Sequence, residues 1–209
     1  MVSREIIVID PGLKIAEAAA FNAMNRSLRR LRASYYLPVI GGVETLRVYE
    51  AGREPNLVAG IVLMGSQASA NDSLPWLDTL RTFLREHIEA GTPIFGICFG
   101  HQLLAHMDGG KVVEHSAGEK FLGLRQVELE AMPELGWAEP FSGELIASHR
   151  EEVVTMPEGW DLIARSDMTA IDGLRHKTRP VWTLQPHPES TLDFLRHQGM
   201  NPLPPAEKL

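Results

Sequence analysis

Long apolar runs, a second cysteine and an excess of basic residues are all missing from this chain of 209 residues. No apolar stretch approaches the ~20 residues that a membrane-spanning helix requires, so we expect no helical membrane protein. A single cysteine excludes an intramolecular disulfide and suits a reducing compartment. A formal net charge of -7 disfavours binding to the phosphates of nucleic acids. Because the chain opens on a strand-like segment without a signal peptide, we expect a cytoplasmic protein.

The composition is typical of a globular protein, with 44% hydrophobic and 22% charged residues. A chain of this length can bury one sizeable core, and the sequence contains no linker-like or repetitive segment. We therefore expect a single domain over residues 1–209. Its proline-rich end, residues 201–209, is predicted to be loosely held.

Strand-like and helical patterns alternate over the first half of the chain. The apolar strand-like segments cover residues 5–10, 44–49, 59–64 and 92–98. The helical segments cover residues 15–32, 75–89 and 99–107. This alternation predicts a three-layer α/β fold, in which helices cover both faces of a mostly parallel central sheet.

The second half of the chain has a different pattern, with short strands between turns and no long helix. These predicted strands cover residues 124–130, 145–148, 162–164 and 181–184. Strands joined in this way favour antiparallel pairing. We expect them to extend the same sheet with a partly antiparallel region.

The single cysteine lies between a predicted strand and a predicted helix. Cys98 has glycines two residues away on either side, Gly96 and Gly100, which is the form of a nucleophile elbow. In so tight a turn, larger side chains at the glycines would collide with backbone, and the middle residue takes a strained conformation facing a cleft. The amides of a helix beginning at Phe99 would favour a thiolate and a developing oxyanion. The alternative is a buried structural cysteine.

A thiol nucleophile usually needs a base and a group that orients the base. His187 follows the last predicted strand, between two prolines that restrict its backbone. In an open parallel sheet this end of the strand is where Cys98 also lies. Glu189 is close enough in sequence to orient the imidazole. Without the elbow, the same segment would be interpreted as a surface turn.

Other histidines give weaker signals. His101 and His106 are five residues apart on one predicted helix, a poor spacing for shared metal ligation. The sequence has no second cysteine and no His-Glu-x-x-His pattern. We therefore expect no metal site.

Two segments together resemble the class I glutamine amidotransferases: GICFGHQLLA, which begins at Gly96, and LQPHPES, which ends at Ser190. That family has the motifs G-x-C-x-G-x-Q and H-P-E. The chain is similar to the standalone branch that is like the amidotransferase domain of GMP synthase. Three weaker matches occur in the same order, at residues 65–69, 135–137 and 148–149.

The resemblance implies that Cys98, His187 and Glu189 form a catalytic triad. The Cys98 thiolate would attack the side-chain amide of glutamine, or of a related γ-glutamyl compound, and His187 would protonate the leaving ammonia. Water would then release glutamate from a γ-glutamyl thioester. This chemistry requires no metal and no organic cofactor.

The resemblance also implies an oxyanion hole and a glutamine site. The oxyanion hole would consist of backbone amides, from Phe99 and from Gly65 or Ser66. The glutamine site would include Gln102 and main chain near Ser148 and His149. An ordinary helix residue is the alternative interpretation of Gln102.

The chain departs from the family pattern at two positions. Many members have Gly-Gly-Pro where this chain has Gly65-Ser66-Gln67, which puts the identity of the oxyanion donor in doubt. An aromatic residue commonly precedes the histidine, whereas this chain has Pro186. The second departure would change the wall of the pocket without removing the chemistry.

Three functions follow from these patterns. The first is a glutaminase that feeds ammonia to a separate synthase subunit, because the sequence has no P-loop for activating an acceptor with ATP. The second is a free-standing γ-glutamyl hydrolase that acts on γ-glutamyl conjugates with the same triad. The third is a non-catalytic relative that binds a ligand or partner through the same cleft.

Overall fold

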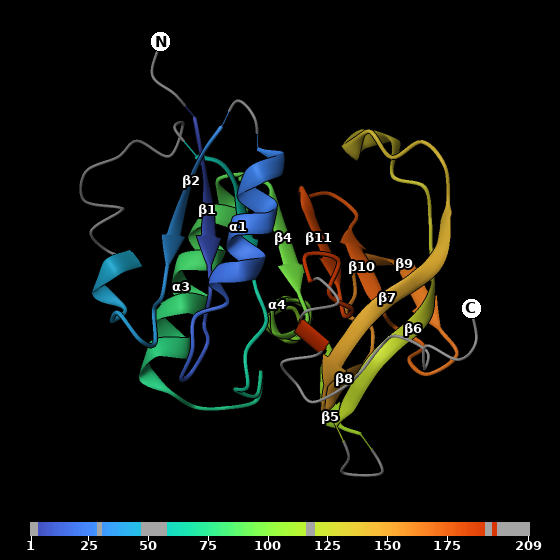
Figure 1. Ribbon diagram of the computed structural model, residues 1–209. Helices are drawn as coiled ribbons and strands as arrows, with labels where there is room; N and C mark the ends of the chain where they lie inside the picture. Colours follow the sequence, from blue (N-terminus) through green and yellow to red (C-terminus); the bar gives the residue numbers. More distant parts are fainter. Residues whose placement is uncertain (1–3, 29–30, 47–57, 116–119, 191–193, 196–209) are drawn as a thin grey trace, which may run out of the picture.

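The computed structural model describes residues 4–28, 31–46, 58–115, 120–190 and 194–195, and nine of the strands in this part form one sheet (Figure 1). Their order is β2-β1-β3-β4-β11-β10-β9-β6-β7. The parallel half consists of β2 (Arg32–Tyr36), β1 (Glu5–Ile9), β3 (Val58–Leu63), β4 (Ile94–Ile97) and β11 (Val181–Leu184). The antiparallel half consists of β10 (Gly173–His176), β9 (Trp160–Ser166), β6 (Phe121–Leu129) and β7 (Phe141–His149).

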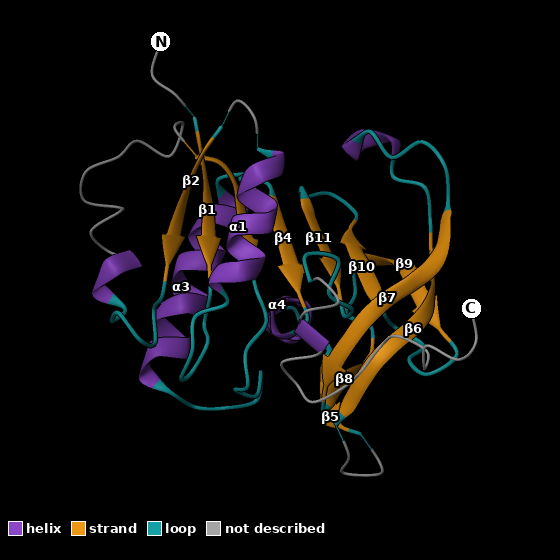
Figure 2. Ribbon diagram, viewed as in Figure 1, coloured by secondary structure: helices purple, strands orange, loops and turns teal. Residues whose placement is uncertain are grey.

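Helices cover both faces of the parallel half (Figures 1 and 2). On one face, Val8 of β1 packs in a cluster with Ala20 of α1 (Ala18–Ser27). On the other face, Ile7 and Ile9 share a core with α3 (Pro75–Glu89) and α4 (Phe99–Met107). Alternate side chains of a strand point to opposite faces, so a strand that is apolar throughout is buried between two helical layers. The predicted three-layer α/β fold is confirmed.

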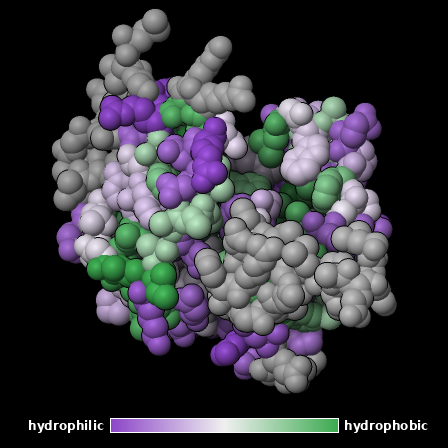
Figure 3. Space-filling view, viewed as in Figure 1, coloured by the Kyte–Doolittle hydropathy of each residue, from purple (hydrophilic) through white to green (hydrophobic). Residues whose placement is uncertain are grey.

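A smaller two-stranded sheet lies beside α4, made of β5 (Lys111–Glu114) and β8 (Glu151–Thr155). A short 3-10 helix, Pro133–Leu135, connects β6 to β7. No helix in the described part of the chain is long and apolar enough to span a bilayer. On the face drawn in Figure 3, polar residues cover much of the described surface and apolar residues form small patches.

The predicted helix over residues 15–32 is shorter in the structure, where α1 covers Ala18–Ser27. The residues before it form a loop instead, because the buried Asp10 carboxylate accepts hydrogen bonds from the amides of Gly12 (2.9 Å) and Glu17 (2.7 Å). The Tyr35 hydroxyl donates to the same carboxylate. At its other end the predicted helix overlaps β2, which begins at Arg32.

The predicted strand over residues 44–49 is wrong in its described part, because residues 44–46 are helical. A turn stabilised by Thr45, whose hydroxyl donates to Gly42 O (2.6 Å), starts this segment. Residues 47–49 lie outside the described residues, as does the tail at 201–209. The strand that pairs with β1 on its outer edge is β2.

The predicted antiparallel extension is confirmed, but it is larger than expected. The predicted strand at 181–184 matches β11, but it pairs in parallel with β4 and so belongs to the parallel half. The strands β6, β7 and β9 are longer than the segments predicted for them. The strands β5, β8 and β10 were not expected. Short strands such as these carry little periodicity, so their pairing depends on partners distant in sequence.

Candidate active site

The cysteine occupies a tight turn between β4 and α4. Cys98 has φ 53° and ψ -103°, and it is the one non-glycine residue with positive φ in the described part of the chain. Such a conformation is costly for a residue with a Cβ and is kept only when the surroundings enforce it. A Cβ at Gly96 would lie 2.7 Å from Gly100 O, and one at Gly100 would overlap Leu63 O. Larger side chains at Gly96 and Gly100 would therefore collide with backbone atoms, as predicted from the sequence.

His187 lies just beyond the end of β11 and is held from two sides. Its backbone N–H donates to Ile146 O of β7 (2.7 Å). Its ring Nδ1 is hydrogen-bonded to Glu189 Oε1 (2.8 Å), and the Phe194 ring stacks on it at 5.8 Å between centroids. A carboxylate accepts, so Nδ1 carries the proton. The buried Nε2 has no hydrogen-bond partner among the described residues.

Cys98 and His187 meet beside Gly65, which follows β3. A Cβ at Gly65 would lie 3.1 Å from His187 Cε1 and 4.0 Å from Cys98 Sγ. Burial alone would lower the pKa of His187, but the adjacent Cys98 and Glu189 raise the pKa of this imidazole well above its ordinary value. The site therefore favours the protonated imidazole.

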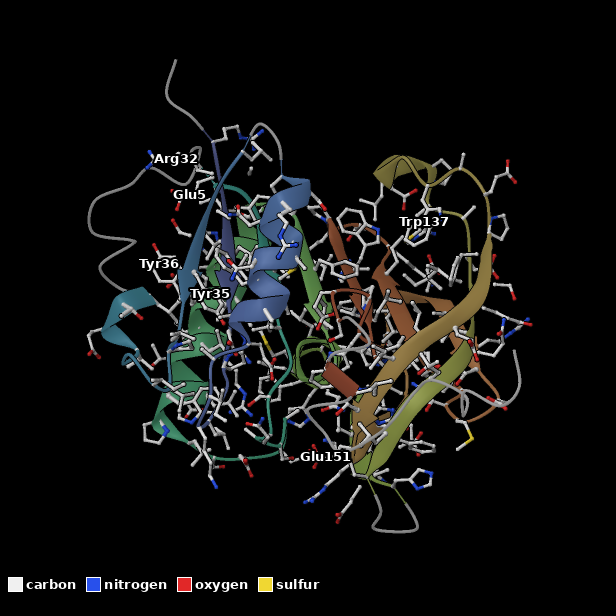
Figure 4. The ribbon with its side chains drawn as sticks, viewed as in Figure 1. Glu5, Arg32, Tyr35, Tyr36, Trp137 and Glu151 are labelled. Atoms are coloured by element: carbon white, nitrogen blue, oxygen red, sulfur yellow. The ribbon has the colours of Figure 1, made fainter. Side chains whose placement is uncertain are left out.

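A cavity of about 530 Å³ opens at this point, within the size range of ligand pockets. Gly65, Cys98 and His187 come from the carboxyl ends of three parallel strands, where ligands bind in open α/β sheets. Charged residues also line the cavity, namely Glu17, Glu114, Lys120, Arg150 and Glu151. In Figure 4, Glu151 is labelled at the start of β8.

The residues expected to form the oxyanion hole lie around the sulfur. Phe99 is the first residue of α4, and the first amides of a helix have no acceptor within it. Gly65 and Ser66 both line the cavity. The Ser66 hydroxyl is turned to its own loop, since it donates to Pro11 O (2.7 Å) and accepts from Ala68 N (3.1 Å). Only the main chain of Ser66 is therefore available as a donor.

The residues expected to bind glutamine also line the cavity, but part of their hydrogen-bonding capacity is used within the protein. The Gln102 amide nitrogen donates to Glu151 O (2.6 Å) and to Gln185 Oε1 (3.1 Å). Ser148 O lies 3.8 Å from Cys98 Sγ and accepts from the thiol.

His149 is a buried neutral histidine at the wall of the cavity. Its Nδ1 donates to Glu151 O (3.0 Å), because a carbonyl only accepts. Burial and the nearby Arg125 guanidinium lower the pKa of His149 to about 3. Its ring stacks on Phe121 at 5.3 Å between centroids. It therefore acts as a wall residue without charge at neutral pH.

Sequence inspection missed several groups at this site. Gln185 is fully buried, and its amide nitrogen lies 3.6 Å from Cys98 Sγ. Ser69 donates to Glu151 Oε1 (2.6 Å) and so links the loop after β3 to β8. A signal for Gln185 was present, because it directly follows the last predicted strand and lies two residues before His187. The Ser69 contact joins residues too distant in sequence to predict.

Trp137 and His101, which the sequence analysis also considered, do not line the cavity. Trp137, from one of the weaker family matches, lies in the β6–β7 connection and packs edge-on against Phe141, away from Glu151 in Figure 4. His101, on α4, is fully buried and hydrogen-bonded to Thr183 (2.8 Å). Within the described residues, no group of three or more His, Cys, Asp or Glu side chains could hold a metal ion.

This geometry can be compared with known proteins. The family model for glutamine amidotransferase class-I matches residues 25–202. The chain belongs to this family. It is 30% identical over 184 residues to a GMP synthase (glutamine-hydrolyzing) subunit from Methanocaldococcus jannaschii, covering 88% of this chain and 87% of that one. The corresponding subunit from Methanopyrus kandleri is 36% identical over 106 residues, about half of each chain (50% and 55%).

Solved structures share the fold of this amidotransferase-family chain. A putative GMP synthase subunit from Thermoplasma acidophilum superposes with a TM-score of 0.72 at 22% identity, covering 90% of this chain and 85% of that one. A glutamine amidotransferase from Thermotoga maritima gives a TM-score of 0.73 at 18% identity, covering 95% and 86%. At these identities the likeness concerns the fold alone.

Proposed function

We propose that this class I amidotransferase is a glutaminase-type hydrolase that releases ammonia from the side-chain amide of glutamine through a thioester on Cys98. One observation carries the proposal. Cys98 and the hydrogen-bonded pair His187–Glu189 lie together beside Gly65, at the carboxyl ends of three parallel strands. Covalent amide hydrolysis needs a nucleophile, a base and a carboxylate that orients the base, and the proximity of these three residues supports that assignment.

The first step is attack of the Cys98 thiolate on the γ-carbonyl carbon. The raised pKa of His187 supports a thiolate–imidazolium pair, and the helix amides at the start of α4 favour the negative sulfur. As the C–S bond forms, the carbonyl oxygen becomes an oxyanion. The amide of Phe99 and one amide of the Gly65–Ser66 segment are its donors.

In the second step, the imidazolium of His187 gives its Nε2 proton to the departing nitrogen, and ammonia leaves as the C–N bond breaks. The γ-glutamyl group is then a thioester on Cys98. Neutral His187 takes a proton from water, hydroxide adds to the thioester, and glutamate leaves as the sulfur is regenerated. Glu189 keeps the Nδ1 proton and the ring orientation through both halves of the reaction.

The substrate's charged end has partners of both signs at the cavity. Lys120 and Arg150 are suited to a carboxylate, and Glu17, Glu114 and Glu151 are suited to an ammonium group. Gln102, Ser148 and His149 would contact the amino-acid part of glutamine, as the family resemblance implies. The relatives are named as subunits of GMP synthase, which supports an ammonia acceptor on a separate synthase subunit.

The test is to measure ammonia and glutamate release from glutamine with the purified chain, by itself and with a candidate synthase subunit. Cys98→Ser should lose turnover by about 10⁴-fold or more while the circular dichroism spectrum is unchanged, and His187→Ala should do nearly the same. The matched control is His106→Ala, on α4 but outside the cavity lining, which should keep the wild-type rate.

The same assay separates the rival functions. Turnover of γ-glutamyl conjugates without glutaminase activity, with or without the synthase subunit, would replace the proposal by the free-standing γ-glutamyl hydrolase. No turnover of either substrate class, and no reaction of Cys98 with a glutamine-like electrophile, would favour a non-catalytic binding protein.

A further inference from the structure

We propose that Gln185 stabilises the Cys98 thiolate directly, as an amide donor to the sulfur that is oriented through Gln102. This inference rests on the proposed function in one respect, that Cys98 reacts as a thiolate. Gln185 Nε2 lies 3.6 Å from Cys98 Sγ, within the range of a hydrogen bond to sulfur, and the Gln185 side chain is fully buried.

The position of Gln185 is set by the backbone around it. Gln185 directly follows β11, and its own N–H donates to Asp172 O (2.7 Å). The preceding residue, Leu184, accepts the N–H of Cys98 (2.8 Å). The residue that follows, Pro186, confines Gln185 to an extended conformation. The strand end that carries Gln185 is therefore attached to the elbow itself.

The orientation of the Gln185 amide follows from a chain of hydrogen bonds with a fixed direction. Glu151 O is a backbone carbonyl and can only accept, so the group of Gln102 that contacts it at 2.6 Å must be the NH₂. That NH₂ has a second donor, which reaches Gln185 at 3.1 Å. Gln185 must present its oxygen to this donor. Its own NH₂ therefore faces the sulfur.

Besides the His187 imidazole, the sulfur has two uncharged polar neighbours that favour opposite protonation states. Ser148 O, at 3.8 Å, can accept a hydrogen bond from the neutral thiol but would repel a thiolate. Gln185 donates, and a donor interacts more strongly with the anion than with the thiol. Since Cys98 is only 4% exposed, few water molecules can take over this role. Gln185 thus offsets the effect of the Ser148 carbonyl and shifts the equilibrium between thiol and thiolate toward the thiolate.

The single cysteine of the chain allows this to be measured without a substrate. The rate of iodoacetamide alkylation, followed by mass spectrometry across a pH series, reports the thiolate of Cys98 alone. Gln185→Leu keeps the approximate size and removes the donor. We expect alkylation near neutral pH to slow by about tenfold and its pH midpoint to rise by about one unit. Gln185→Glu should raise the midpoint further, because a carboxylate repels the anion.

The matched control is Gln126→Leu, at an exposed glutamine on β6 that bonds to Ser142 and does not line the cavity. It should leave the midpoint unchanged. If Gln185→Leu fails to fold by circular dichroism, Gln102→Met is the deciding variant. It removes the group that orients Gln185 and should raise the midpoint in the same direction by a smaller amount. An unchanged midpoint in the folded variant would overturn the proposal.

Failure of this inference is distinguishable from failure of the proposed function. Alkylation requires no glutamine, so a raised midpoint in Gln185→Leu supports the role of Gln185 even where the wild-type chain releases no ammonia. Conversely, normal glutaminase activity with an unchanged midpoint would keep the hydrolase and reject the role of Gln185.

Discussion

The parallel and antiparallel halves of the sheet contribute different groups to the cavity. The parallel half delivers the sulfur and the imidazole, since Cys98 and His187, like Gly65, each follow a parallel strand. The antiparallel half delivers Ser148 and His149 at the end of β7, which form a polar wall. The candidate catalytic residues thus follow strands that are buried between helices, whereas the wall residues belong to a strand of the half that contains a buried ion pair.

The buried polar support of the antiparallel half is an ion pair between Arg125 of β6 and Asp172. The two groups are 2.8 Å apart, and their side chains are 4% and 0% exposed. Arg125 also donates to the Thr169 hydroxyl (2.8 Å). Burial raises the pKa of the Asp172 carboxyl, although Arg125 opposes this shift. Asp172 O also accepts the N–H of Gln185, so the ion pair is connected by one hydrogen bond to a residue that contacts Cys98.

The largest effect on stability is expected from Arg125→Leu, which breaks the support of the antiparallel half. It leaves the Asp172 carboxyl buried without its partner and should cost about 3–5 kcal/mol of unfolding free energy in urea titration. The double variant Arg125→Leu/Asp172→Leu should recover most of that loss. A single variant as stable as the wild-type protein would mean that the pair contributes nothing to this half.

Low pH should destabilise both halves of the sheet, because each half contains or packs against a buried neutral histidine. Burial lowers the pKa of both His101 and His149 to about 3, with Arg125 contributing at His149. The unfolded chain binds protons at these histidines below their ordinary pKa of about 6.5, so stability falls as the pH is lowered from about 6.5 toward 3. Between pH 7 and pH 5 each should cost about 2 kcal/mol.

The measurement is urea unfolding at both pH values for the wild-type protein and for His101→Asn. Asparagine can keep the hydrogen bond to Thr183 but does not titrate. The variant should lose about 2 kcal/mol less on acidification than the wild-type protein does. Equal losses in both proteins would show that His101 is not a source of acid sensitivity.

The packing of the parallel half is tested by Gly100→Ala. The added methyl group would overlap Leu63 O at the end of β3, so α4 must shift against the sheet. We expect a loss of about 1–3 kcal/mol of unfolding free energy and a clear loss of turnover. Gly91→Ala is the control for a destabilising glycine substitution without a collision, because Gly91 has φ 73° and a Cβ there meets no atom within 4 Å. It should lose stability without losing turnover.

Among the three candidate catalytic residues, the smallest loss of turnover is expected at the orienting carboxylate. Glu189→Gln keeps a hydrogen-bond acceptor near His187 Nδ1 but removes the charge that helps raise the imidazole pKa. We expect the glutaminase rate to fall by about 10- to 100-fold, well short of the loss in Cys98→Ser. A loss as large as that of Cys98→Ser would mean that Glu189 does more than orient the ring.

The sequence predicted the parallel half better than the antiparallel half. The elbow around Cys98 is a local feature, since strand, glycines and helix follow one another in the chain. The strand at 181–184 and the position of His187 at its end follow from a short apolar run and a proline-bounded turn. Such features depend on neighbours in sequence, and the structure contains them where they were expected.

The polar contacts could not be predicted because they join residues distant in sequence. Gln185 meets Gln102 across 83 positions, and Arg125 meets Asp172 across 47. The loop before α1 was mistaken for helix because it leads into an alanine-rich segment that favours a helix, while the buried Asp10 carboxylate holds the loop amides in another arrangement. In this loop, hydrogen bonds from backbone amides to a nearby side chain override helix propensity.

The most direct test of the central claim is mass spectrometry of the wild-type chain after incubation with a diazo-ketone analogue of glutamine, with the candidate synthase subunit present. The Cys98 nucleophile should form a covalent adduct on its own peptide, glutamine should protect against the adduct, and His187→Ala should slow its formation. A folded protein whose Cys98 peptide stays unmodified would contradict the account.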